Sequence, residues 1–333
     1  MIALPIPLVV SLVLGFLLAR ALFLHQRPRP FLALLAACAV QGVIVSLSQY
    51  YGLIGLLTVQ PVTATFIPPL AWVTFQTTAI RSADLRRDGF HIAAPAFTLF
   101  CVLFAPQALD FVVPAVFLVY GVLIVAALRT GADSLPLTRL EAGDLPMHVW
   151  RAIAVALMLS ALSDVMIATA LVLGIAWLQP VIVSVFSSLW LLAIGALSLS
   201  QSLGEGDATP AERSVEPSEP DTALMVELQA VLEKDGLYLD PGLTLARLAR
   251  RLRVPVKRLS TAVNRASGDN VSRYINGFRI RHACRRLEDG ANITAAMLDS
   301  GFNTKSNFNR EFLRVMGKAP SEWLANRSPK PSG

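Results

Sequence analysis

The chain has 333 residues, of which 54% are hydrophobic and only 16% are charged, and its formal net charge is +6. This composition is too apolar for an ordinary soluble domain and predicts membrane-spanning segments. The three cysteines lie far apart and form no CxxC pair, so neither a disulfide framework nor a zinc site is predicted.

Seven apolar segments are long enough, or nearly so, to cross a bilayer core, which takes about 20 helical residues. They cover residues 4–24, 31–50, 61–80, 91–107, 111–128, 150–173 and 179–200. The fourth segment is the weakest, because it is short and carries a proline near each end. In the third segment, Pro68 and Pro69 predict a kink, which a helix bundle tolerates.

The basic residues of the connecting loops predict the orientation of these segments. Arginine occurs in the first, third and fifth loops, whereas the second, fourth and sixth loops contain neither lysine nor arginine. Positive residues mark the cytoplasmic side of a membrane. We therefore expect residues 1–203 to form a seven-helix membrane domain, with the N-terminus outside and the C-terminus in the cytoplasm.

One carboxylate lies deep within the predicted membrane domain. Asp164 falls inside the sixth apolar segment, where an ionised side chain is costly and usually faces a cavity or a partner. It is the candidate signal-sensing residue. The alternative is a structural carboxyl group that is hydrogen-bonded to Ser163, Gln41 or another helix.

The charge and composition change abruptly after the last apolar segment. Residues 205–220 hold five acidic residues and one arginine, whereas residues 221–333 hold 19 basic and 11 acidic residues. Residues 204–221 are rich in Pro, Glu, Ser and Gly, which predicts an acidic disordered linker. The basic excess that follows is expected of a nucleic-acid-binding surface, although a solvated basic surface gives the same count.

Residues 222–327 have the pattern of a small all-α domain. Two pairs of short helices are predicted, and a longer helix over residues 271–287 joins them. Thr244 and Thr304 are placed to cap one helix in each pair by accepting a backbone hydrogen bond. Phe308 and Phe312 lie four residues apart and share one buried helical face. In each predicted pair, two helices are joined by a turn and the second has a polar outer face, which is the helix-turn-helix arrangement. Residues 328–333 are predicted to form a disordered tail.

A run of residues in the second pair resembles the C-terminal signature of AraC/XylS-type transcription regulators. The matching residues are Gly301, Phe302, Ser306, Phe308, Arg310, Phe312, Gly317 and Pro320. The resemblance covers residues 222–327 and implies two helix-turn-helix motifs that bind double-stranded DNA. Thr261 stands where many members of the family have arginine. Met297 stands where alanine is common, and we expect it to pack there because methionine is adaptable.

The resemblance also implies which side chains contact DNA. The candidates in the first motif are Lys257, Arg258, Thr261 and Arg265. The candidates in the second motif are Lys305, Ser306, Asn309 and Arg310. Arginine, lysine, asparagine, serine and threonine are the donors that reach base edges and phosphates, although a single such residue is often merely solvated.

Together with the resemblance, the sequence thus predicts an all-α transcription regulator in the inner membrane of a bacterium. It would couple a signal in its seven-helix domain to a cytoplasmic DNA-binding domain. Its predicted partners are the lipid bilayer and double-stranded DNA, with a homodimer and RNA polymerase as further possible partners. No GxGxxG, P-loop, HExxH or GxSxG motif occurs, so no catalytic, cofactor or metal site is predicted. The alternative is a membrane transporter or enzyme with a regulatory C-terminal interaction domain.

Overall fold

The computed structural model describes residues 5–23, 29–129, 135–175, 177–186 and 219–325. The chain divides into two compact units, Met1–Arg129 with Val149–Leu197 and Thr130–His148 with Ser198–Gly333. The described residues are helical or connecting, and their only bridge of β type is an isolated antiparallel pair, Arg139 and Thr244. The predicted all-α class is therefore confirmed.

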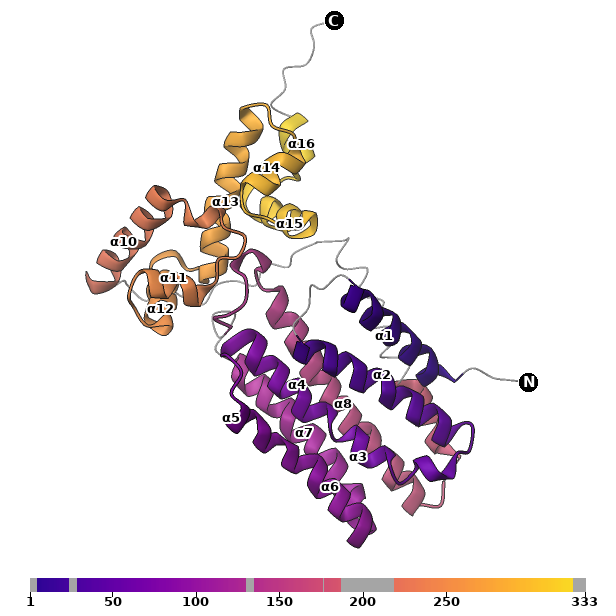
Figure 1. Cartoon of the computed structure of the whole chain (residues 1–333). Coiled ribbons are helices and arrows are strands. Elements are labelled where there is room, and N and C mark those ends of the chain that lie inside the picture. The colour runs from indigo at the N-terminus through magenta and orange to yellow at the C-terminus, as the bar shows by residue number, and fades with distance from the viewer. Residues whose placement is uncertain (1–4, 24–28, 130–134, 176, 187–218, 326–333) are drawn as a thin grey trace, which may run out of the picture. The chain divides into compact units, whose positions relative to one another are not determined.

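The first unit is a bundle of apolar helices (Figure 1). The helices are α1 (Ile6–Phe23), α2 (Arg29–Gln49), α3 (Gln60–Ala64), α4 (Ile67–Phe75), α5 (Leu85–Gly89), α6 (Ala93–Phe104), α7 (Leu109–Leu128) and α8 (Leu145–Val172). Helix α1 packs along α2, α2 packs against α4, and α4 and α6 pack against α7. A π-helical turn (Gln76–Ile80) continues α4.

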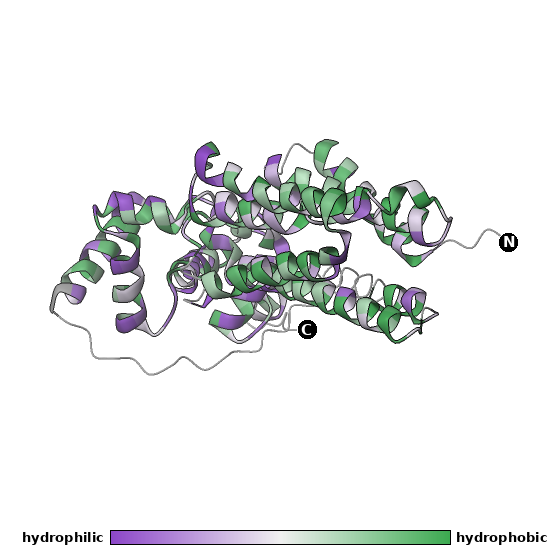
Figure 2. Ribbon diagram, turned by 90° about the horizontal axis from the view of Figure 1, so that it is seen from below, coloured by the Kyte–Doolittle hydropathy of each residue, from purple (hydrophilic) through white to green (hydrophobic). Residues whose placement is uncertain are grey.

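Four helical stretches of this unit are long and apolar enough to cross a membrane, namely Ile6–Phe23, Arg29–Gln49, Pro106–Leu128 and Leu145–Val172. Large apolar side chains on them are exposed, among them Phe16, Phe111 and Leu162. Figure 2 shows the prevalence of hydrophobic residues along these helices. Because soluble proteins rarely expose so much contiguous apolar surface, these helices are suited to a lipid environment.

The prediction of seven spans is not confirmed. The third predicted segment is divided between α3 and α4, and the fourth contains the 12-residue helix α6. The seventh is helical over residues 178–186 and then enters residues 187–218, which lie outside the described residues. The predicted kink at Pro68 and Pro69 is a break between two helices, because both prolines lie in the first turn of α4, where a missing N–H costs least.

The second unit contains two groups of three helices joined by α13 (Val271–Glu288) (Figure 1). The first group is α10 (Glu219–Asp235), α11 (Leu245–Arg251) and α12 (Val256–Ser267). The second group is α14 (Ile293–Asp299), α15 (Lys305–Met316) and α16 (Pro320–Ala325). Each group has its own hydrophobic core, and α13 contributes one end to each. Met297 is buried in the second core, as predicted.

The helix ends of this unit follow from local sequence. Thr244 and Thr304 accept hydrogen bonds from the N–H groups of Arg247 and Asn307 at 3.2 and 3.4 Å, which confirms both predicted caps. Gly317 ends α15 with a φ of +71°, a left-handed conformation that favours glycine. Phe308 and Phe312 are fully buried, whereas Lys305 and Asn309 keep part or all of their side chains accessible.

Candidate nucleic-acid interface

The first candidate DNA-reading surface lies on α12. Leu259 and Val263 are fully buried and fix the orientation of the helix on the first core. Lys257 and Arg258 are exposed, and Thr261 is half-buried. The outer surface of the second helix of this motif therefore carries two exposed positive charges and one hydroxyl. This is the surface through which a helix-turn-helix protein contacts the major groove.

The second candidate surface lies on α15, the corresponding helix of the other motif. Lys305 is exposed, and Ser306 and Asn309 are half-buried. The T-shaped contacts of Phe308 with Phe302 and Phe312, at centroid distances of 5.4 Å, hold the opposite face of the helix in the core. An asparagine at such a position can form two hydrogen bonds to adenine.

Two of the predicted DNA-contacting arginines are engaged within the protein. Arg265 Nη1 lies 3.1 Å from Asp221 Oδ2, and this carboxylate is mostly buried. Arg310 Nη2 donates to the carbonyl oxygen of Ala142 at 3.0 Å, and its Nε lies 3.7 Å from Glu311 Oε1. The structure thus places the eight candidates on α12 and α15, but it gives Arg265 and Arg310 intramolecular partners that sequence reasoning missed.

The two motifs are tied together by a buried arginine of α13. Arg279 is fully buried, and its Nε and Nη2 donate to the carbonyl oxygens of Tyr238 and Asp240 at 2.6 and 2.8 Å. Its Nη1 donates to Asn276 Oδ1 at 3.1 Å, and its guanidinium lies over the ring of Phe302. Burial lowers the pKa of Arg279 to about 10, although nearby carboxylates oppose this shift. The side chain remains cationic at neutral pH.

A segment that sequence reasoning treated only as the fifth loop belongs to this unit. Residues 135–144 lie against the DNA-binding motifs, and Leu140 is buried in the first core. Asp144 Oδ2 accepts from Nη2 and Nε of Arg273 at 2.8 and 3.1 Å. The signal in the sequence was that this loop carries acidic residues, among them Glu141 and Asp144, as well as arginine.

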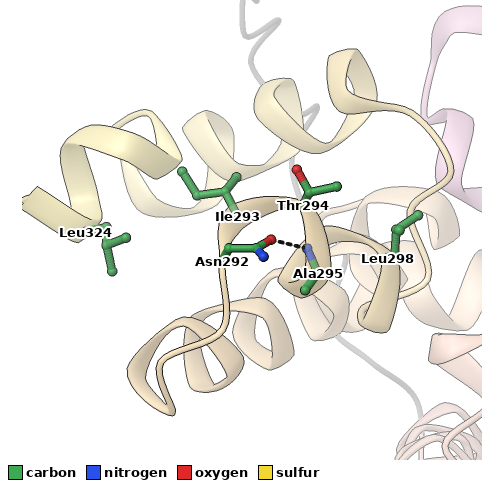
Figure 3. A pocket seen from close by; sticks show the side chains of 6 residues that line it. All are labelled: Asn292, Ile293, Thr294, Ala295, Leu298 and Leu324. Atoms are coloured by element: carbon green, nitrogen blue, oxygen red, sulfur yellow. Dashed lines mark hydrogen bonds between the residues drawn. The ribbon is translucent and has the colours of Figure 1, made fainter.

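A shallow apolar pocket lies between α14 and α16, and its lining includes none of the candidate DNA-contacting residues. Figure 3 shows its lining residues, Asn292, Ile293, Thr294, Ala295, Leu298 and Leu324. The Asn292 side chain caps α14 by accepting from the N–H of Ala295 at 2.8 Å (Figure 3). This side chain therefore has a structural role, and the pocket offers mainly aliphatic surface.

A family model described as a helix-turn-helix domain matches residues 248–326. This range contains α12, α13, α14 and α15, and hence both candidate surfaces. No match was found among curated proteins or among solved structures.

Residues 248–326 form an AraC/XylS-type helix-turn-helix domain, and this domain supports a DNA-binding regulator of transcription. The same match supports the binding of double-stranded DNA by this domain. The apolar helices of the first unit allow an association with a membrane.

Proposed function

We propose that this protein is a membrane-bound, sequence-specific transcription regulator in the inner membrane of a bacterium. The observation that carries the proposal is that an AraC-type DNA-binding domain and four helices of membrane-spanning length occur in one chain. The arginine-bearing odd loops support an N-terminus outside and a DNA-binding domain in the cytoplasm. The proposed division is a membrane sensor over residues 1–203, a linker over 204–221 and a DNA-binding domain over 222–327. Two parts depart from these bounds: residues 135–144 belong to the DNA-binding unit, and α10 begins at Glu219.

The proposed contacts with DNA come from both candidate surfaces. Asn309 and Arg258 are the side chains suited to base edges, because amide and guanidinium groups form paired hydrogen bonds there. Lys257 and Lys305 are suited to phosphates. Two helix-turn-helix motifs on one connecting helix fit successive major-groove segments about 10 bp apart. The proposed set is completed by Thr261, Ser306, Arg265 and Arg310. Arg265 and Arg310 would exchange their intramolecular partners for DNA.

The proposed input is a signal received by the membrane helices. Asp164 lies on α8 and is half-buried, as a side chain that faces a partner or cavity within a helix bundle would be. Association of two tethered copies would raise the affinity for DNA through effective concentration, which is the basis for proposing a homodimer. Regulation of transcription also implies an encounter with RNA polymerase at the target promoter.

Capture of genomic DNA fragments by membranes that contain the full-length protein tests the proposal. We expect a discrete set of fragments to be retained, and retention to fall steeply with salt because phosphate contacts release counterions. Lys257→Ala should lower the slope of log affinity against log salt by about 0.9 for all fragments alike. Asn309→Ala should instead change which fragments are retained.

Lys318→Ala is the matched control, because this exposed lysine lies beyond the end of α15. It should leave both the slope and the set of fragments unchanged. Retention that is unrelated to sequence, and equal in all four proteins, would contradict sequence-specific binding.

A further inference from the structure

The docked segment over residues 135–144 has no role in the function proposed so far. It connects the apolar helices α7 and α8, and Asp144 directly precedes the first residue of α8. Nevertheless, it belongs to the same compact unit as the helix-turn-helix motifs. A loop between two candidate membrane spans is therefore part of the DNA-binding unit.

The first half of the segment is anchored by backbone pairing and by one apolar side chain. The carbonyl oxygen of Pro136 accepts from the N–H of Ala246, and the N–H of Leu140 donates to the carbonyl oxygen of Leu243, both at 3.0 Å. The side chain of Leu140 is only 4% exposed. Burial of a leucine side chain stabilises the docked position, so the segment is held by more than surface charges.

The carbonyl oxygen of Leu140 gives a second anchor on α13. It accepts from the hydroxyl of Ser272 and from Asn276 Nδ2, the latter at 3.2 Å. Ser272 and Asn276 are both buried. Buried donors of this kind cost stability when they lose their partner, so the docked position of the segment is well defined.

The second half of the segment presents oxygen atoms to donors at the junction of the two motifs. Asp144 accepts from Asn270 Nδ2 at 2.9 Å as well as from the guanidinium of Arg273. Glu141 accepts from the backbone N–H and side-chain amide of Asn303 at 2.8 and 3.3 Å. Asn303 directly precedes Thr304, the residue that caps α15.

Arg310 is held by the same part of the segment. Its guanidinium donates to the carbonyl oxygen of Ala142, and Gly143 lies so close that a Cβ there would be 3.1 Å from Nη2. Guanidinium groups, side-chain amides and backbone N–H groups near helix N-termini are the donors that proteins use for DNA phosphates. A carboxylate paired with arginine has the same charge-assisted geometry as a phosphate.

We propose that residues 135–144 form an intramolecular clamp that competes with DNA for donors around α15. In the docked state the clamp occupies Arg310, Asn303 and Arg273 with carbonyl and carboxylate oxygens. Release of the clamp frees these donors for DNA. Because α8 continues from Asp144 and contains Asp164, a displacement of α8 is the event that withdraws the clamp. The inference rests on the proposed function, since it assigns the regulation of that DNA-binding surface.

Neutral, nearly isosteric replacements in the clamp test this competition in the full-length protein. Asp144→Asn combined with Glu141→Gln weakens the docked state without changing α12 or α15. We expect the double variant to bind captured genomic fragments about tenfold more tightly than the wild type, a change that corresponds to about 1.4 kcal/mol. Asp269→Asn combined with Asp289→Asn is the matched control, because it removes the same charge from the turns that flank α13.

The control variant is expected to bind less than twofold more tightly than the wild type. If the clamp variant bound no more tightly than this control, or more weakly than the wild type, competition would be contradicted. Weaker binding than the wild type would mean that the segment stabilises the DNA-binding form. If neither the wild type nor any variant retained specific fragments, the proposed function itself would fail, which is a separate outcome.

A reversible lock provides a second test that does not depend on removing charge. Arg139 and Thr244 form an isolated antiparallel bridge pair, and directly opposed residues of this kind have Cα atoms close enough for a disulfide. In an Arg139→Cys/Thr244→Cys variant, oxidation should reduce binding at least about tenfold, and dithiothreitol should restore it. Each single cysteine variant serves as the oxidation control. Equal or tighter binding after oxidation would overturn the clamp.

Discussion

Gly301→Ala is expected to abolish DNA binding by separating the two helix-turn-helix motifs. Gly301 has a φ of +81°, and a Cβ at this position would lie 2.6 Å from the carbonyl oxygen of Leu239 and 3.0 Å from that of Tyr238. These are backbone atoms, which cannot move aside as a flexible side chain does. Backbone strain costs about 1–3 kcal/mol and forced overpacking costs a similar amount, so we expect a loss of about 3–5 kcal/mol.

Thermal unfolding of the full-length protein, followed by the fluorescence of Trp323 in the second core, measures this loss. Other tryptophans are removed by Trp→Phe replacement so that the signal reports this core. Gly290→Ala is the matched control, because Gly290 also has a positive φ, +89°, but a Cβ there meets nothing within 4 Å. The control should lose only the backbone part, about 1–2 kcal/mol. Equal losses in the two variants would contradict the assigned close approach.

Arg279→Met is expected to be the most damaging change on α13. Methionine retains an unbranched apolar stem but leaves the carbonyl oxygens of Tyr238 and Asp240 without their present donors in the interior. Removal of one member of a buried, hydrogen-bonded charged network costs about 3–5 kcal/mol. Arg279→Lys should rescue little, because one ammonium group does not reproduce the planar fork that reaches three separate acceptors.

Arg281→Met is the control for Arg279→Met. Arg281 is exposed two residues further along the same helix, and its guanidinium lies over the ring of Phe278. An exposed contact of this kind contributes about 0.5–1 kcal/mol. Urea unfolding of the two variants should therefore differ by at least about 2 kcal/mol. A stable, DNA-binding Arg279→Met protein would show that the two motifs do not depend on this arginine.

Much of the DNA-binding domain was predictable because its signals are local. The threonine caps, the glycine after α15 and the four-residue spacing of Phe308 and Phe312 each act within one or two helical turns. The predicted long helix over residues 271–287 agrees with α13 to within one residue at its end. The boundary with the predicted linker over residues 204–221 agrees less closely, because α10 already begins at Glu219.

The roles of Arg265, Arg310 and the clamp were not predictable in the same way. Asp221 lies 44 residues from Arg265, and Ala142 lies 168 residues from Arg310. Helical periodicity shows only that an arginine lies on an outer surface, and it does not show which distant carboxylate or carbonyl oxygen reaches it. The orientation of the membrane segments was predicted from the arginines of the fifth loop. The contacts that dock this loop come instead from its acidic residues, from Leu140 and from backbone carbonyl oxygens.

In the membrane domain, hydrophobicity alone did not predict where each helix begins and ends. A window of hydrophobic residues does not distinguish one continuous helix from two short ones, so the break between α3 and α4 was missed. Pro68 and Pro69 were correctly recognised as incompatible with an undisturbed helix interior. Whether they kink a helix or begin a new one depends on the residues before them, Thr65 and Phe66, which lie in a turn.

The most direct test of the central claim is genome-wide DNA occupancy of the full-length protein in intact cells. The wild type is compared with an Arg258→Ala/Asn309→Ala variant, and the membrane fraction of both is measured in parallel. We expect both proteins to be in the membrane fraction, and discrete occupancy peaks in the wild type that are lost in the variant. Identical occupancy profiles for two membrane-bound, equally abundant proteins would contradict a membrane-bound regulator that reads DNA through α12 and α15.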